Sequence, residues 1–155
     1  LALLSVAGTA CYASGIPASN HSWVRGPEWS FKAPEQGWWF IHRGKGNQTV
    51  LTGSSYYNIG ARPMVVSLSK YCGIEAAPEP AGVQIGSATK WIGGRLGELK
   101  AYRSIDRSNA PTIVYVARVR QNECRWAFTC EGDARRTREV QTICDGMVST
   151  LEFHE

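Results

Sequence analysis

Residues 110–155 decide the fold, and they read APTIVYVARVRQNECRWAFTCEGDARRTREVQTICDGMVSTLEFHE. Residues 112–119 and 124–130 are rich in β-branched and aromatic side chains, which favour β-strands. Residues 121–123 lie between these two runs and are polar, as is typical of a tight turn. The stretch therefore predicts a β-hairpin, followed by a helix and a short closing strand.

The second strand of this hairpin is predicted to bury one face. Side chains alternate between the two faces of a strand, so its large apolar residues collect on a single side. They are Cys124, Trp126, Phe128 and Cys130. The opposite face carries Arg125, Ala127 and Thr129. We expect the first face to pack against another layer of the protein.

A helix is predicted after this strand, because Gly132 breaks the extended pattern and Asp133 supplies an oxygen that can cap a helix. The apolar residues that follow recur at the spacing of one helical stripe. They are Val140, Ile143, Cys144, Met147 and Val148. Packing of this stripe on the Trp126/Phe128 face predicts an α+β fold: one domain, with a twisted antiparallel sheet packed by a C-terminal amphipathic helix.

The rest of the chain predicts further strands and no second long helix. The expected strands are 22–25, 29–34, 38–43, 48–52, 64–72 and 96–103, with 38–43 as a central strand and 83–85 as a short edge strand. Gly93 and Gly94 are expected at a strand edge or bulge. Residues 75–82, with Pro78 and Pro80, are expected to form a surface loop.

Length and composition indicate one globular domain. A chain of 155 residues buries about 70% of the surface that its unfolded form exposes. With 43% hydrophobic and 19% charged residues, the composition is not that of a disordered protein. The net charge of +4 is small and both signs are interspersed, so nucleic acid is not expected as a partner.

The N-terminal segment resembles the end of a signal peptide. The run LALLSVAGTA is apolar and closes on small residues, but it is too short to span a bilayer, which takes about 20 residues. Cys11 stands where bacterial lipoproteins carry the lipidated cysteine, although Gly8 occupies the usual leucine position. Lipidation at Cys11, simple secretion and an ordinary N-terminal element stay open. The predicted organisation is 1–13 for signal or lipid anchor, 14–21 for a tether and 22–155 for the domain.

Four further cysteines predict two disulfide bonds and an oxidising compartment. They are Cys72, Cys124, Cys130 and Cys144. On one strand Cys124 and Cys130 would lie about 20 Å apart, too far to bond to each other. A helix that runs back over the strand favours Cys124 with Cys144 and Cys72 with Cys130, and the reverse assignment stays open. Zinc held by the four thiolates is the competing interpretation, but the spacing lacks the usual paired signature.

Several short motifs, in this order along the chain, resemble the PsbP-like fold family. They are FKAPEQGW at 31–38, IGGRL at 92–96, WAFT at 126–129 and STLEF at 149–153. That family includes the extrinsic photosystem subunit PsbP, a nuclear transport cofactor, and bacterial secreted lipoproteins and secretion chaperones. The resemblance implies an antiparallel sheet flanked by helices, and binding of partners rather than catalysis. The body cysteines and the proline-rich segment near Pro78 depart from the family pattern.

Candidate catalytic groups are few. Residues 67–70 and 87–90 match Ser-x-x-Lys, in which a lysine can activate a serine one helical turn away, but both lie in predicted strands or loops. Residues 44–49 are glycine-rich like a phosphate loop but are expected to be a hairpin turn. The three histidines are scattered: His21, His42 and His154. We predict no catalytic residue, no cofactor and no metal; a hydrolase using a Ser-Lys pair, or a Cys/His metal-binding module, are the alternatives.

Arginines are the first candidates for partner binding. Arg135, Arg136 and Arg138 crowd the start of the predicted helix, where the macrodipole already places positive charge. An anionic partner would offset this cost. A solvated face with acidic neighbours is the simpler interpretation.

Tryptophans are the second candidates. Adjacent residues of a strand point to opposite faces, so Trp38 and Trp39 cannot share one core, and one of them can line an apolar groove, as can Trp91. Packing in a core covered on both faces is the alternative. The sequence thus predicts a non-catalytic binding or accessory protein of the bacterial envelope, periplasmic or extracellular, with a protein or peptide partner.

Overall fold

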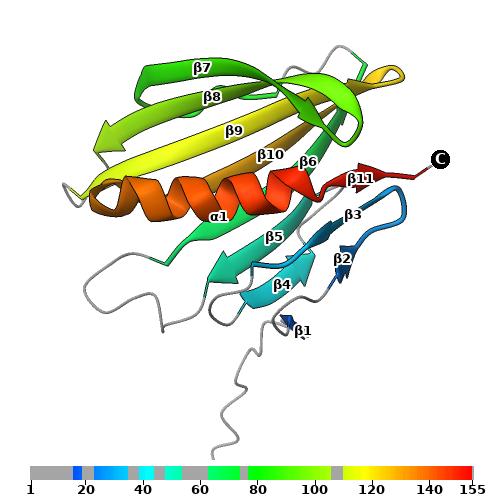
Figure 1. Ribbon diagram of the computed structural model, residues 1–155, viewed down its shortest axis with the longest axis horizontal. Coiled ribbons are helices and arrows are strands. Elements are labelled where there is room, and N and C mark those ends of the chain that lie inside the picture. The colour runs from blue at the N-terminus through cyan, green and yellow to red at the C-terminus, as the bar shows by residue number, and fades with distance from the viewer. Residues whose placement is uncertain are drawn as a thin grey trace, which may run out of the picture.

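The computed structural model describes residues 16–18, 23–34, 39–43, 48–53, 63–73, 77–105 and 110–154, with side chains in all but 16–18, 39–43 and 48–53. Figure 1 shows that a large twisted antiparallel sheet carries one helix, α1 (Thr137–Ser149), across one of its faces. A small second sheet lies beside the helix. The protein is α+β, and the predicted fold class is confirmed.

Within the described residues the large sheet has eight strands and the small sheet has three. The order in the large sheet is β1 (Ile16–Ala18), β4 (Trp39–Arg43), β5 (Gln48–Gly53), β6 (Val65–Cys72), β10 (Cys124–Asp133), β9 (Pro111–Gln121), β8 (Arg95–Ile105) and β7 (Val83–Ile92). The order in the small sheet is β11 (Glu152–Phe153), β3 (Trp29–Lys32) and β2 (Trp23–Arg25). Two expectations change: β1 falls within the expected tether, and β4, expected to be central, is second from the sheet edge.

The predicted C-terminal hairpin is formed by β9 and β10. The strands pair from Cys124 opposite Gln121 to Asp133 opposite Thr112, and Asn122 in the turn has a φ of 55°. Asparagine tolerates this left-handed conformation better than most residues. The hairpin thus lies where the β-rich runs and the polar turn predicted it.

The core lies between the large sheet and the layer made by α1 and β3. Phe128 of β10 is 1% exposed and meets Phe31 of β3 edge to face, with ring centroids 5.1 Å apart. Trp29 shares this buried face, and exposed Lys32 points away. The predicted helical stripe is confirmed: four of its members are buried and Ile143 is partly buried against the same core.

The helix begins later than predicted. β10 continues to Asp133, and a 3-10 turn, η2 (Ala134–Arg136), precedes α1. The Asp133 side chain accepts a hydrogen bond from the Arg135 backbone N–H at 2.9 Å, so it caps the 3-10 turn and not α1 itself.

This later start explains why the preferred disulfide pairing was wrong. The structure pairs Cys72 with Cys124 and Cys130 with Cys144, which is the assignment that had been left open. Counted back from Asp133, Cys130 lies about 10 Å along the strand, and Cys144 lies about 10 Å along the helix from its start. Cys124 lies much farther back, opposite Cys72 on β6, with 4.2 Å between the two Cα atoms.

A second hairpin was not foreseen. β7 and β8 are joined by Gly93 and Gly94, both with positive φ, in a two-residue turn. The glycines are therefore the turn itself, and the bulge of β7 lies between Gln84 and Gly86. A Cβ at Gly93 would lie 2.6 Å from the Phe153 ring, so glycine also lets the turn pack against β11.

The face of the sheet opposite α1 carries a smaller apolar cluster, which includes Tyr102, Val114 and Val116. The proline-rich segment lies on this face. Glu79 there accepts hydrogen bonds from the Tyr102 hydroxyl and, at 2.7 Å, from Arg118. The pKa of Glu79 is lowered, chiefly by the hydrogen bond from Arg118 and next by the one from Tyr102. The pKa of Tyr102 is raised, chiefly by burial and next by its hydrogen bond to Glu79. Residues 77–82 form the expected loop.

Candidate partner-binding surface

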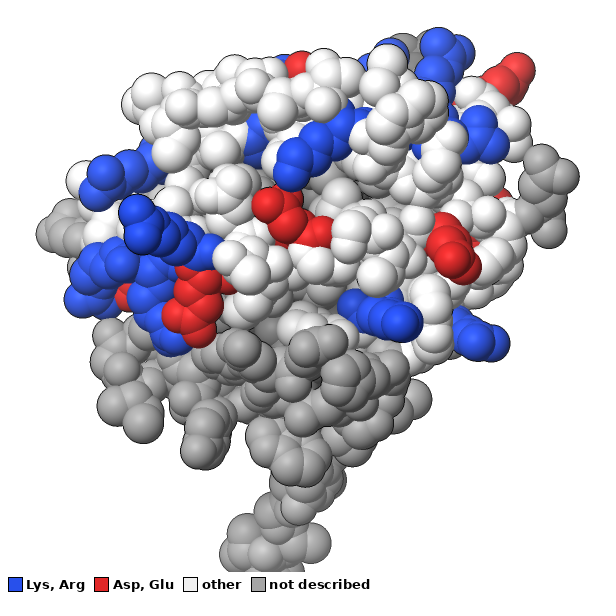
Figure 2. All heavy atoms as spheres, in the orientation of Figure 1, with Lys and Arg blue, Asp and Glu red and all other residues white. Residues whose placement is uncertain are grey.

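The most exposed apolar side chains of the described residues gather largely on the β7–β8 hairpin. Trp91 is 72% exposed, and Leu96, directly opposite it on β8, is 63% exposed. Val83 and Ile85 at the start of β7 are 70% and 54% exposed. In Figure 2 the upper margin of the molecule, over β7 and β8, is mostly uncharged. Val83 pairs with Arg103, at the other end of the hairpin from Trp91, so only Trp91 and Leu96 are adjacent. Adjacent exposed apolar side chains mark an interaction site more often than scattered single residues do.

The hairpin is attached to the rest of the protein next to its turn. Ile92, next to the turn, is fully buried in the core. Lys90 donates to Asp145 of α1 at 2.9 Å, which ties the edge strand to the helix. Because side chains alternate, Lys90 and Ile92 face α1 while Trp91 faces the other side of the sheet. The structure therefore presents Trp91 and Leu96 together on a supported surface.

The three arginines at the start of α1 do not act as one cationic group. Arg135 binds the carboxylate of Asp133 through its guanidinium, and Arg136 binds Glu139. Figure 2 shows blue and red side chains interleaved over this end of the helix. These acidic partners offset the unfavourable position of the arginines in the helix dipole. Arg138 is exposed, and no acidic partner is found for it among the described residues.

The Arg135 guanidinium lowers the pKa of the Asp133 carboxyl from 3.8 to about 2 through its hydrogen bonds. A folded-state pKa below the unfolded value stabilises the protein above the unfolded pKa, and this stabilisation is lost as the pH falls. We expect the wild-type protein to lose stability between about pH 4 and about pH 2 more steeply than Asp133→Asn, which keeps a capping oxygen. Urea unfolding across this range measures the difference; parallel curves would contradict it.

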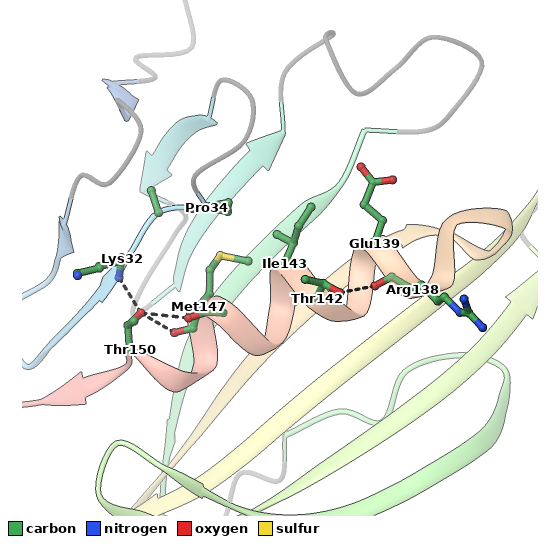
Figure 3. A pocket seen from close by; sticks show the side chains of 10 residues that line it. Lys32, Pro34, Arg138, Glu139, Thr142, Ile143, Met147 and Thr150 are labelled. Carbon is green, nitrogen blue, oxygen red and sulfur yellow. Dashed lines mark hydrogen bonds between the residues drawn. The ribbon is translucent and has the colours of Figure 1, made fainter.

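A groove of about 530 Å³ runs between α1 and the end of β3. Figure 3 shows Pro34, Ile143 and Met147 turned toward it, with Lys32 and Arg138 near its opposite ends. Its lining combines these apolar side chains with Lys32, Arg138 and the acidic Glu139. Arg138, from the predicted arginine group, is among the residues that line this groove.

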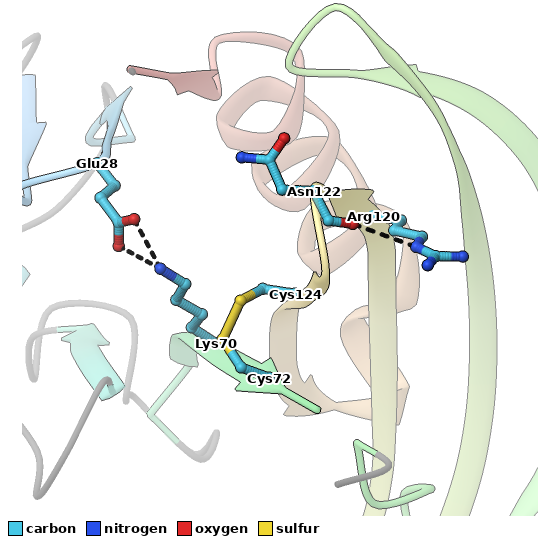
Figure 4. The surroundings of a disulfide bond; sticks show 6 residues. All are labelled: Glu28, Lys70, Cys72, Arg120, Asn122 and Cys124. Atoms are coloured by element: carbon cyan, nitrogen blue, oxygen red, sulfur yellow. Dashed lines mark hydrogen bonds and ion pairs between the residues drawn. A yellow bond between two sulfur atoms is a disulfide. The ribbon is translucent and has the colours of Figure 1, made fainter. Parts of the chain in front are cut away.

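The two Ser-x-x-Lys patterns lie on β6 and β7, where residues three apart point to opposite faces. Their lysines are bound elsewhere: Lys70 donates to Glu28 at 2.6 Å, as Figure 4 shows, and Lys90 donates to Asp145. Neither lysine is placed to activate the serine of its own pattern. Hydrolysis by a Ser-Lys pair therefore has no support from this geometry.

A serine–histidine contact that the sequence did not reveal joins Ser30 to His154. The Ser30 hydroxyl lies 2.9 Å from His154 Nε2, and the His154 backbone N–H donates to the backbone carbonyl of Glu28 at 2.8 Å. Ser30 is only 3% exposed, although it lines a pocket of about 370 Å³ together with His154. The contact holds the C-terminal segment on β3. No sequence signal pointed to it, because the two residues are 124 positions apart.

The remaining predicted site residues fall into two groups. Cys11, Trp38, His21 and the Trp39 and His42 side chains lie outside the described residues. The four body cysteines are all in disulfides, so the zinc interpretation with four thiolates is wrong. No cluster of metal-binding side chains occurs in the part of the chain that the structure describes.

Two disulfides are typical of proteins that fold outside the cytoplasm. Among the described helices, none has the length and hydrophobicity needed to cross a membrane.

Comparison with known proteins adds little. No family model and no curated protein matches this chain. Among solved structures, a similar one is described as "Crystal structure of LpqN involved in cell envelope biogenesis of Mycobacterium tuberculosis". It is 9% identical, with a TM-score of 0.42, and the match covers 95% of this chain and 88% of that chain. A similarity this low says nothing about the function of this chain.

Proposed function

We propose that this chain is a non-catalytic binding protein of the bacterial envelope, which holds a protein or peptide partner through the β7–β8 hairpin. The exposed pair Trp91 and Leu96, on an edge hairpin tied to the core through Ile92 and Lys90, is the observation that carries the proposal. Aromatic residues are enriched among those that dominate binding energies at protein interfaces. An exposed tryptophan on a rigid support is therefore a suitable anchor.

The disulfides and the resemblance to the PsbP-like family support the envelope assignment. An oxidising compartment preserves both disulfides. Within the family, bacterial secreted lipoproteins and chaperones are the members with matching location. A lipid on Cys11 would hold the chain at a membrane, and the mass of the N-terminal peptide of native protein distinguishes this from simple secretion.

Affinity capture from native envelopes under non-reducing conditions tests the proposal. We expect the double variant Trp91→Ser/Leu96→Ser to retain about tenfold less of the species bound by the wild type, because both anchors lose their apolar surface. Ile105→Ser is the matched control, since Ile105 is equally exposed at 70% but lies at the far end of β8. Equal capture by the double variant would overturn the proposal.

A further variant separates the hairpin from the groove beside α1. Lys32→Ala/Arg138→Ala removes the two cations of the groove and leaves the hairpin unchanged. We expect its capture of the partner to equal that of the wild type. If this variant loses capture while Trp91→Ser/Leu96→Ser retains it fully, the partner-binding site is the groove and not the hairpin.

A further inference from the structure

β7 is the last strand of the large sheet, and in the described part of the chain it pairs with β8 alone. Its outer edge therefore presents backbone groups without a strand partner among the described residues. Ten residues long, it is exposed at every position from Val83 to Thr89. An edge of this length can accept another extended chain.

The turn identifies which backbone groups point outward. In the two-residue turn the Ile92 carbonyl and the Arg95 N–H form the closing pair, and bonded and non-bonded pairs then alternate along the antiparallel ladder. Trp91, Thr89 and Ser87 belong to the non-bonded pairs. Their N–H and C=O groups consequently face the free edge.

Natural edge strands are usually protected by charges, prolines or bulges. β7 has no proline, and its bulge is confined to Gln84–Gly86. Its one charged residue, Lys90, is turned toward α1 and bound to Asp145. The stretch from Gly86 to Ile92 is therefore regular and unprotected.

We propose that β7 binds an extended segment of an acidic partner protein by strand addition, so that the segment becomes the next strand of the sheet. This deepens the proposed function and rests on it. The main-chain groups of Ser87, Thr89 and Trp91 bond the segment, and Trp91, supported by Leu96 beside it on β8, packs against the apolar side chains of the segment. Strand addition uses backbone bonds for affinity and alternate side chains for specificity.

The acidic character of the partner follows from the charge of the hairpin. Residues 83–105 contain four basic side chains and one acidic one: Lys90, Arg95, Lys100 and Arg103, with Glu98. Arg95 and Arg103 have no acidic partner among the described residues, so the hairpin is positive at both ends. A negative segment is attracted to it, and a second copy of the same hairpin is repelled.

The test uses the full chain and the capped peptide EVEIEVEIE, in which apolar and acidic residues alternate. We expect it to bind, and two matched peptides to fail: KVKIKVKIK, which reverses the charge, and EVEIEVEIE methylated at alternate amide nitrogens, which cannot complete the ladder. On binding, amide exchange at Ser87, Thr89 and Trp91 should slow. No detectable binding at about 1 mM peptide, or binding of all three peptides alike, would overturn the proposal.

Two variants of Thr89 test the backbone contact itself. Thr89→Pro removes an outward N–H without touching the bonds to β8, because an edge strand tolerates proline on its free side. We expect it to weaken peptide binding about tenfold, while Thr89→Val, which keeps the N–H, binds like the wild type. Equal melting temperatures of the two variants show that the fold is retained. If Thr89→Pro melts lower, the alternately methylated peptide decides: its binding to the wild type would refute strand addition.

The outcomes separate this inference from the proposed function. Suppose that capture of the partner requires Trp91 and Leu96, but that the partner binds the Thr89→Pro variant as strongly as it binds the wild type. The hairpin then binds through side chains alone, and strand addition is wrong. If capture of every bound species is independent of Trp91 and Leu96, the proposed function itself is wrong, and strand addition is refuted with it. A dimer of the free chain that Thr89→Pro dissociates would assign the edge to a second copy.

Discussion

Replacing Phe128 by alanine is expected to lower the free energy of unfolding by about 3–5 kcal/mol, the range measured for buried aromatic residues. Phe128 is 1% exposed on β10 and lies against Phe31 of β3. Its ring thus joins the large sheet to the small one. Removing it leaves a cavity that two sheets and a helix, all held by further contacts, can close only in part. Urea unfolding at equilibrium measures the loss.

Phe128→Leu is the matched control, because it keeps most of the apolar volume and should cost much less. The double variant with Phe31→Ala tests whether the two rings act together. We expect the two losses to be non-additive by about 0.5–1.5 kcal/mol, which is the usual energy of an aromatic pair beyond its burial. A loss below about 1 kcal/mol for Phe128→Ala would show that Phe128 is not in a packed core.

Removing the disulfides gives the second large effect. The chain-entropy description assigns about 4 kcal/mol to Cys72–Cys124, whose cysteines are 52 residues apart, and about 3 kcal/mol to Cys130–Cys144, whose cysteines are 14 residues apart. We therefore expect Cys72→Ser/Cys124→Ser to lose more stability than Cys130→Ala/Cys144→Ala. The measurement is urea unfolding of both variants, with the m-value rising as the unfolded chain expands.

The two disulfides differ in burial as well as in loop length, and these two factors predict opposite orders for the losses of stability. Cys130 and Cys144 are buried in the core, whereas Cys72 lies exposed at the end of β6, near the Asn122 turn in Figure 4. A larger loss from the buried pair would mean that native-state packing outweighs the entropy of the unfolded chain. Native protein in which all four thiols are free would contradict the pairing itself.

The β7–β8 hairpin shows how a tertiary partner can override local preference. Gly86, Ser87 and Ala88 are weak strand formers, so only 83–85 was predicted as strand. Pairing with β8 extends the strand to Ile92. The two adjacent glycines between apolar residues are a hairpin signal that would have identified the turn and the exposed position of Trp91.

The arginines at the start of α1 illustrate a different limit. Asp133 and Glu139 lie within three residues of Arg135 and Arg136, so their pairing was foreseeable as the simpler interpretation. That Arg138 lines a groove with Lys32 was not foreseeable, because the groove exists only after β3 packs beside the helix. The sequence indicated which residues carry charge, and the packing of distant elements decided which of them face a concave surface.

Taken by itself, the sequence determined what depends on short-range periodicity: the β9–β10 hairpin, its buried Trp126/Phe128 face and the apolar stripe of α1. These follow from alternation in strands and the helical repeat, which any chain of this pattern must obey. The tertiary structure alone decided which cysteines pair, which glycines turn the chain and which strand forms the free edge. Each of these depends on where an element begins or which distant strand it meets, and differences of two or three residues in those positions change the outcome.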